Sequence, residues 1–228
     1  MNEREKIFAR IREALTVPAP VPGRHHDSRV SAIEHKLPAA NAREWLPLTG
    51  ETFEEQLARF RENSASLKTE FLFIESGELE LRLKELRDRE GWKKIASHSG
   101  ELTTAAVRAL ELPVCWTSEN YDVNELEKCD AGITECDALV AQTGSVLLTN
   151  RSAGGRALSV LPPHHVVLAR RDQLLRDLPA AFQLVKEKYG ENYPSMISFV
   201  TGPSRTGDIE RILVLGAHGP KKLTVFCF

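Results

Sequence analysis

Apolar positions along the first half of the chain alternate between helical spacing and short continuous runs. Apolar side chains recur every three or four positions in residues 52–67, 77–91 and 99–111. Short strand-like stretches follow at residues 71–75 and 113–117, and a weaker one at residues 93–97. Strands separated by helices of about a dozen residues are typical of βαβ units. The pattern predicts an α/β fold with a mostly parallel sheet flanked by helices. Gly91 is expected to close the second helix, and Ser99 to cap the third.

The second half of the chain departs from this alternation. Residues 138–150 look like two strands joined around Thr143 and Gly144, which predicts an antiparallel excursion from the sheet. Residues 165–170 and 223–228 read as strands, and residues 172–190 as a helix interrupted at Pro179. Residues 196–202 are apolar enough for a central strand buried on both faces.

The first 49 residues are expected to form an appendage to a main domain at residues 50–228. Ile7, Ile11 and Leu15 recur at helical spacing, so residues 2–15 predict an amphipathic helix. Four prolines in residues 16–29 predict an extended arm. Two interpretations of the helix stay open, because it can pack on its own domain or dock on a partner.

Charge and cysteine content narrow the class of protein. The 228 residues carry a formal net charge of −2 and no basic run, which argues against a nucleic-acid or membrane-surface partner. No apolar stretch reaches the roughly 20 residues of a membrane span, and the charged N-terminus is unlike a secretory signal. The cysteines, none in a C-x-x-C pair, are Cys115, Cys129, Cys136 and Cys227. They predict reduced thiols in a cytoplasmic protein without a cluster or other cofactor.

A glycine-rich segment at residues 201–220 is the strongest candidate for a ligand site. Gly202, Ser204, Arg205 and Thr206 follow an apolar run, and a short helix is expected to start between Thr206 and Asp208. Ligands of open α/β sheets bind at the carboxyl ends of strands, and a helix start offers free N–H groups to an anion. The hydroxyls and the planar guanidinium would complete an anion site. The alternative is a capped helix whose arginine forms a structural salt bridge.

A second candidate segment spans residues 134–165. Gly154 and Gly155 allow close approach of the backbone to a ligand, and Arg156 beside them resembles the arrangement at Arg205. Thr143 and Gly144, at the turn between the two expected strands, are further candidate ligand-binding residues. Glu135 is a candidate general base or nucleophile, although nothing in the sequence sets it apart from an ordinary surface carboxylate.

The histidines predict no metal site. His164 and His165 are adjacent on an extended segment and point to opposite faces, so both cannot easily bind one ion. A site assembled from His98, His164 and His218 is conceivable but has no motif behind it. His218 lies between glycine-rich neighbours and is the best functional candidate, since it can change its charge near neutral pH.

Three quoted stretches resemble the LUD domain (lactate-utilisation) family: GITECDALVAQTGSVLL, GGRALSVLPPHHVVL and SFVTGPSRTGDIERILVLGAHGPKKLTVFCF. The resemblance covers residues 131–228 well. It implies a fold like that of the NagB, RpiA and CoA-transferase proteins. It also implies a part in the oxidation of L-lactate to pyruvate, in company with two iron–sulfur subunits. In that arrangement this chain would be a non-redox subunit that binds a small anion.

Two other functions stay open. The chain can be a stand-alone transferase or isomerase that acts on a phosphorylated or CoA-linked small acid. Glu135 or Glu210 would then be the base or nucleophile, and His218 would assist proton transfer. Alternatively the chain is a scaffold whose N-terminal helix docks on partners.

Overall fold

A computed structural model describes residues 5, 8, 9, 12, 49–118, 120–207, 213–215 and 218–228 of the chain. The chain divides into two units, Met1–Asn41 and Ala42–Phe228, and the elements below belong to the second unit. The four described residues of the predicted N-terminal helix, Glu5, Phe8, Ala9 and Arg12, are helical. The rest of that helix and the proline-rich arm lie outside the described residues. The domain boundary between residues 49 and 50 stays a prediction.

Six parallel strands form the central sheet, in the order β1-β12-β7-β4-β2-β3. They are β1 (Glu70–Phe73), β2 (Ile95–Ser97), β3 (Val114–Trp116), β4 (Ala131–Glu135), β7 (His164–Ala169) and β12 (Lys222–Cys227). The predicted α/β class with a mostly parallel sheet is confirmed. One central strand, β4, was not among the predicted strands.

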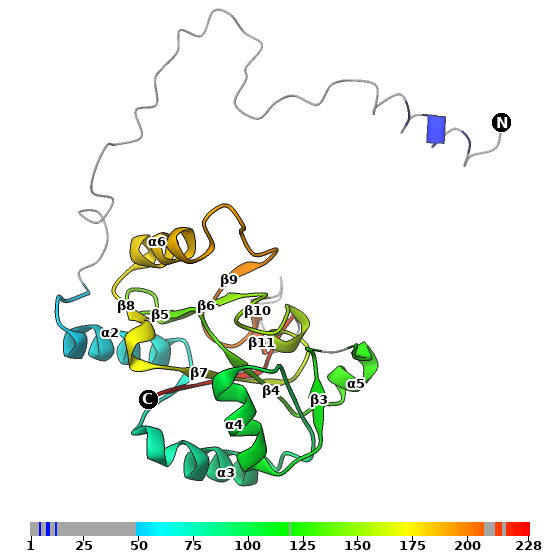
Figure 1. The fold of residues 1–228 in the computed structure, drawn as a ribbon, viewed down its shortest axis with the longest axis horizontal. Helices are drawn as coiled ribbons and strands as arrows, with labels where there is room; N and C mark the ends of the chain where they lie inside the picture. Colours follow the sequence, from blue (N-terminus) through cyan, green and yellow to red (C-terminus); the bar gives the residue numbers. More distant parts are fainter. Residues whose placement is uncertain are drawn as a thin grey trace, which may run out of the picture. The chain divides into compact units, whose positions relative to one another are not determined.

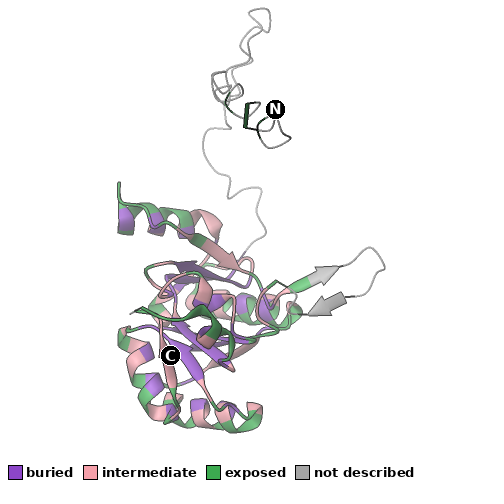
Figure 2. Ribbon diagram, turned by 90° about the vertical axis from the view of Figure 1, so that its right-hand side faces the viewer, coloured by how far each residue is buried: buried purple, intermediate pink, exposed green. Residues whose placement is uncertain are grey.

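Helices α3 (Leu79–Glu90) and α4 (Glu101–Leu110) lie side by side on one face of this sheet (Figure 1). Leu83 and Leu110 of these helices share one buried cluster with Ile133 of β4. A short helix, α5 (Val123–Glu127), which the sequence pattern did not predict, buries Leu126 beside the sheet. Figure 2 shows the buried residues gathered in the strands and on the inner sides of the helices.

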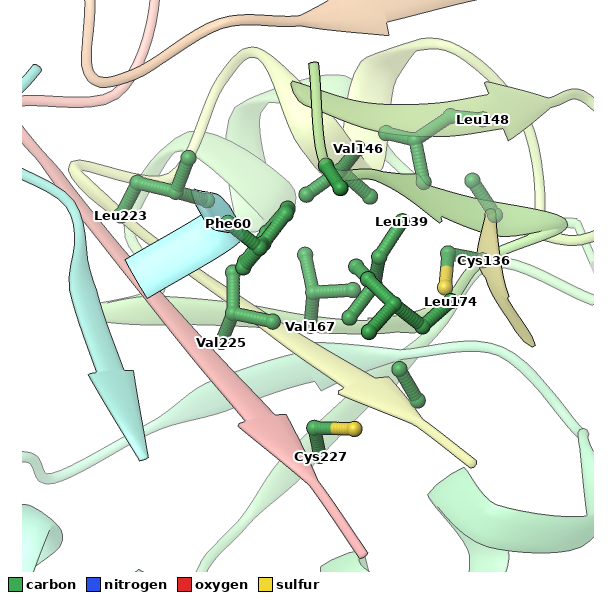
Figure 3. Close-up of a cluster of buried hydrophobic side chains, with 13 residues drawn as sticks. Phe60, Cys136, Leu139, Val146, Leu148, Val167, Leu174, Leu223, Val225 and Cys227 are labelled. Atoms are coloured by element: carbon green, nitrogen blue, oxygen red, sulfur yellow. The ribbon is translucent and has the colours of Figure 1, made fainter. Parts of the chain in front are cut away.

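The opposite face of the sheet packs against α2 (Phe53–Ser66) and a second, four-stranded sheet. Phe60 of α2 meets Val167 and Val225 of the central sheet in the core between the layers (Figure 3). Side chains alternate across a strand, so Val166 and Leu168 point the other way, into the cluster beneath α3 and α4.

The second sheet has the order β8-β5-β6-β9 and contains the predicted antiparallel excursion. Its strands are β5 (Ala138–Val140), β6 (Ser145–Thr149), β8 (Leu174–Leu175) and β9 (Ile197–Val200). Helix α6 (Leu178–Tyr189) covers its outer face, where Ala181 and Val185 pack on Leu147. Three single turns of 3₁₀ helix complete the fold: η2 (Ser76–Glu78), η3 (Ala157–Ser159) and η4 (Arg171–Gln173).

Helix termini follow the capping residues, with two departures from prediction. Gly91 adopts a φ of 70° and ends α3 as expected. The N-cap of α4 is Gly100 rather than Ser99, because a carboxylate from β4 satisfies the first amides of this helix. The helix predicted over residues 172–190 begins only at Leu178, with Asp177 as its cap. Pro179 lies in the first turn, where its missing N–H costs nothing, so it starts the helix instead of interrupting it.

Two predictions for the C-terminal region are wrong. The strand predicted to be central and buried on both faces is β9, an edge strand of the second sheet, and Ile197 is 40% exposed. The helix predicted to start at residues 206–208 is also absent at the described positions. Arg205–Gly207 (β10) and Leu213–Leu215 (β11) form an antiparallel pair. Asp208 and Glu210 lie outside the described residues.

Candidate functional site

The predicted anion site borders a cavity of about 660 Å³. Five of the predicted residues line it, from three separate loops: Arg156, Gly202, Ser204, Arg205 and His218. The cavity lies where β9 ends, but at the amino ends of β7 and β12, since Arg156 precedes β7 and His218 precedes β12. The expectation of a site at the carboxyl ends of the strands therefore holds for β9 and not for the central sheet.

The loop after β9 is held in place by its own backbone and by neighbouring segments. Gly202 has a φ of 86°, a conformation that other residues rarely adopt. The Ser204 N–H donates to the Pro220 carbonyl at 2.8 Å, which ties this loop to the segment before β12. The Thr201 hydroxyl lies 2.8 Å from the Ser145 hydroxyl of β6. These contacts fix the backbone from which Arg205 extends.

Two cationic side chains of the cavity are available to a ligand. Arg156 and Arg205 are both exposed, and within the described part of the chain neither forms an ion pair or a hydrogen bond. Arg176, by contrast, pairs with Glu51 at 2.7 Å. The Arg205 Nη2 atom lies 3.6 Å from the position that a Cβ would take on Gly202, so the guanidinium folds back over its own loop. An unpaired guanidinium offers five donors in a planar fork that matches a carboxylate or phosphate.

The helix N-terminus invoked for this site is replaced by strand β10. Without that helix, no helix dipole acts on an anion at Thr206, and the side chain of Thr206 is not described. The anion-binding capacity of the cavity therefore depends on the two guanidinium groups, the Ser204 hydroxyl and His218, which is exposed. The proposed roles of Asp208 and Glu210 stay predictions.

Glu135 does not line the cavity, and its carboxylate has a structural contact instead. Its Oε1 accepts hydrogen bonds from the N–H groups of Leu102 and Thr103, at 2.8 and 3.3 Å. These amides belong to the first turn of α4, so the carboxylate occupies the anion position of that helix terminus. The Glu135 N–H in turn donates to His98 Nε2 at 3.3 Å.

The paired glycines and the hairpin turn support the fold beside the cavity. A Cβ on Gly144 would lie 2.7 Å from the backbone nitrogen of Ser64 in α2, and the Thr143 hydroxyl is buried. A Cβ on Gly154 would lie 2.2 Å from the Cβ of His98. Gly155 has a φ of 103° and open space around it. These residues shape the turns and are not among the residues that line the cavity.

The buried histidines have separate partners. His164 Nε2 lies 2.8 Å from the Thr224 hydroxyl, and His165 Nε2 lies 2.9 Å from the Thr134 hydroxyl on the opposite face. Burial lowers the pKa of His164 to about 4 and that of His165 to about 3. Burial also lowers the pKa of His98, against the opposing effect of Glu135. No group of three or more metal-ligating side chains occurs among the residues that the structure describes.

Sequence reasoning missed one wall of the cavity. This wall consists of residues before and within β9 and of two residues in the segment after Arg156. The residues are Ser159, Val160, Ser195, Met196, Ile197, Ser198 and Val200. The apolar run suggested a buried strand, and only the interspersed serines hinted at an exposed edge. None of the helices in the described part of the chain has the length and apolar content of a membrane span.

Comparisons with known proteins agree with this fold and its motifs. A sequence model of the LUD domain matches residues 74–227. A lactate utilization protein C from Shouchella clausii is 31% identical over 180 residues, 74% of this chain and 77% of the relative. Another from a Geobacillus species is 28% identical over 195 residues, 79% of this chain and 81% of the relative.

One solved structure shows the same fold. A DUF162 family protein from Deinococcus radiodurans superposes with a TM-score of 0.61 at 19% sequence identity, over 78% of this chain and 99% of that one. The LUD match covers most of the chain that carries the six-stranded sheet and the cavity. The chain therefore belongs to the LUD domain family.

Proposed function

We propose that this chain is a component of a system that oxidises L-lactate to pyruvate, in which it is a non-redox subunit that binds a small anion. The names of its relatives, lactate utilization protein C, support the lactate part of this proposal. The electron-transfer steps would belong to iron–sulfur partner subunits.

The observation that carries the proposal is the presence of two unpaired guanidinium groups at one cavity. Arg156 and Arg205 come from different loops, and within the described residues each lacks an acidic partner. A carboxylate such as that of lactate or pyruvate can accept two parallel hydrogen bonds from one guanidinium. The Ser204 hydroxyl borders the same cavity and can bond the second polar group of a 2-hydroxy or 2-oxo acid.

The environment of the cysteines supports a non-redox subunit. Cys136 and Cys227 lie in the hydrophobic core between the layers (Figure 3). Burial raises the pKa of Cys129 and Cys227 to about 11, and that of Cys136 well above its usual value. Cluster iron binds the thiolate form, which these environments disfavour.

Calorimetric titration of the full chain with L-lactate and with pyruvate tests the binding step. Arg205→Ala is expected to weaken binding at least about tenfold, because a charge-assisted bond to a carboxylate contributes roughly 1.5–3 kcal/mol. Arg205→Lys is expected to restore only part of the affinity, since an ammonium cannot reproduce the bidentate fork. Arg59→Ala is the matched control, because Arg59 is an exposed arginine on α2 that pairs with Glu62. Unchanged affinity in Arg205→Ala would refute the assignment.

The partner step needs a separate experiment. The tagged chain is expected to co-purify with iron–sulfur subunits from cells grown on L-lactate, and its deletion is expected to impair that growth. If the chain neither associates with such subunits nor affects growth on lactate, the proposed system is wrong even where anion binding is found.

The size of the cavity favours one alternative. A volume of about 660 Å³ is far more than a three-carbon acid fills, which suits a stand-alone enzyme for a phosphorylated or CoA-linked acid. His218 borders this cavity, but Glu135 caps α4 and is committed elsewhere. Turnover of such substrates by the isolated chain, lost in His218→Gln, would favour this alternative. Inactivity across a panel of them would count against it.

A further inference from the structure

The cavity runs along the free edge of a strand. Side chains alternate across a strand, so a hollow under one face would touch every second residue. This cavity instead touches Ile197 and Ser198, which lie on opposite faces of β9, and Val200, together with two residues just before the strand. Within the described residues β9 pairs only with β6, and its other edge faces the cavity.

The ladder between β6 and β9 shows which backbone groups of β9 point away from β6. The Asn150 N–H donates to the Met196 carbonyl at 3.3 Å, and the register continues with Leu148 opposite Ser198. Bonded and non-bonded pairs alternate in an antiparallel ladder. The N–H and C=O groups of Ile197 and Phe199 therefore point outward, away from β6, and are available to another strand.

One wall of the groove is apolar, although only Ile197 of the residues that form it lines the cavity itself. Phe182 of α6 packs on Phe199 with ring centroids 5.4 Å apart, and Ile197 shares the face of β9 that carries Phe199. Phe182 and Ile197 are 57% and 40% exposed, and Tyr193 in the connection between α6 and β9 is 53% exposed. Large apolar side chains gathered at a sheet edge are typical of an interaction surface.

The other wall is cationic. Met196 and Val200 point to the core between the two sheets, the side from which the loops of Arg156 and Arg205 approach. A strand added to β9 would thus present alternate side chains to an apolar wall and to a cationic wall. Acidic residues among the side chains that face the cationic wall would complement the guanidinium groups of Arg156 and Arg205, which are unpaired within the described residues.

We infer that the free edge of β9 binds an extended segment of another protein chain, in which acidic and apolar residues alternate. The segment adds as a fifth strand to the second sheet through the outward backbone groups of Ile197 and Phe199. Ile197–Val200 spans roughly 13 Å at about 3.3 Å per residue, which sets the length of the paired core. A second copy of this chain does not fit, because pairing two β9 edges would bring two sets of unpaired arginines together.

This inference shares Arg156 and Arg205 with the proposed anion site, but it depends in addition on the backbone edge at Ile197, which the anion site does not use. The two proposals can therefore fail separately. Loss of lactate binding with retained segment binding would refute only the proposed function, and the reverse would refute only the present inference.

The test uses a capped seven-residue peptide of alternating valine and glutamate, titrated against the full chain by fluorescence anisotropy. One control peptide has lysine in place of glutamate, and another has the same composition with the glutamates grouped at one end. We expect the alternating peptide to bind at least about tenfold more tightly than either control. Hydrogen exchange at the Ile197 and Phe199 amides is expected to slow on binding.

Matched variants locate the contact. Ile197→Pro removes an outward donor at the first residue of an edge strand, where proline is tolerated, and is expected to weaken the alternating peptide about tenfold. Ile197→Ala removes the side chain but keeps the N–H donor, so its affinity for the peptide is expected to fall by less. Phe182→Ser is expected to weaken binding several-fold, whereas Leu81→Ser is not, although Leu81 is also 57% exposed. Unchanged lactate binding and thermal midpoint in Ile197→Pro would show that the fold is intact.

Three outcomes would overturn the inference. The first is no binding of the alternating peptide at about 1 mM, an affinity weaker than recognition sites of this kind show. The second is an equal loss of peptide affinity in Ile197→Pro and Ile197→Ala, because the backbone N–H of Ile197 would then play no part in binding. The third is a dimer in light scattering that Ile197→Pro dissociates, because the edge would then belong to a second copy.

Discussion

The carboxylate of Glu135 lies on the first turn of α4, where its Oε1 accepts a hydrogen bond from the Leu102 N–H at 2.8 Å. The contact joins the end of a central strand to the start of a helix 33 residues earlier in the chain. It also explains why α4 begins without a side-chain cap of its own, since Gly100 stands at the cap position. A Cβ on Gly100 would lie 2.1 Å from this carboxylate oxygen, so a larger residue there would displace Glu135.

Glu135→Ala is expected to lower the free energy of unfolding by about 1–2 kcal/mol, the usual effect of removing a helix cap. Glu135→Gln keeps an acceptor oxygen and is expected to lose less stability, because only the attraction between the carboxylate charge and the helix terminus is removed. Urea denaturation of the three proteins measures the difference. Anion binding is expected to stay unchanged in both variants. A loss of binding or activity without a loss of stability would restore Glu135 as a catalytic candidate.

Gly144→Ala tests the contact between the hairpin turn and α2. Gly144 has a φ of 64°, and a Cβ there would lie 2.7 Å from the Ser64 nitrogen. Gly91 adopts the left-handed conformation with a φ of 70° but has no neighbour within 4 Å of such a Cβ, so Gly91→Ala reports the backbone strain alone. We expect Gly91→Ala to cost about 1 kcal/mol of stability and Gly144→Ala at least about 2 kcal/mol more. Equal losses in thermal or urea denaturation would mean that α2 moves aside at no cost.

The local pattern of the first half of the chain was sufficient to predict its elements. Helical spacing and short apolar runs gave the βαβ order, and the turn at Thr143 and Gly144 gave the excursion. Strand β4 escaped prediction because its sequence, AGITE, has little apolar character. Its burial comes from its central position: Gly132 passes so close to Leu158 that a Cβ would lie 2.4 Å from the carbonyl oxygen. That close approach is a tertiary constraint and leaves no periodic signal.

Five of the predicted residues line the cavity, but the architecture around them differs from the prediction. Ile209, Ile212 and Leu213 are spaced for a helix, yet the described ends of this segment pair as strands β10 and β11. Spacing over so few residues cannot distinguish a helix from a hairpin when tertiary contacts decide. Arginines between glycines and prolines were the useful signal, because such residues need an exposed loop. The groove along β9 could not be predicted, since nothing local tells an edge strand from a central one.

Asp137 is a buried carboxylate that ties α6 to the connection between β4 and β5 through an ion pair with the exposed Lys188. Its Oδ1 accepts hydrogen bonds from Lys188 Nζ and the Tyr189 hydroxyl, both at 2.6 Å. Burial opposes the charge, but the bonds from Lys188 and its neighbours outweigh it, and the pKa of Asp137 is lowered. Asp137→Ala is expected to cost about 2 kcal/mol in urea denaturation, because the buried Tyr189 loses an acceptor, whereas the exposed Lys188 is solvated. The control Asp88→Ala breaks an exposed pair with Arg87 and is expected to cost under about 1 kcal/mol.

The buried histidines predict a loss of stability in mild acid. A histidine in an unfolded chain has a pKa near 6.5, whereas burial holds His164 at about 4 and His165 at about 3. Between these values the unfolded chain binds protons that the folded chain excludes, so stability is complete above about pH 6.5 and falls as the pH decreases.

Each histidine is expected to account for about 2 kcal/mol of the stability lost between pH 6.5 and 5. Carboxylates with lowered pKa, such as Asp137, lose their contribution only below about pH 5, so the buried histidines, His98 included, dominate this window. In urea denaturation at both pH values, His164→Gln and His165→Gln are each expected to reduce the difference by about 2 kcal/mol, whatever their absolute cost. A difference that persists undiminished in both buried variants would mean that other groups cause the acid sensitivity.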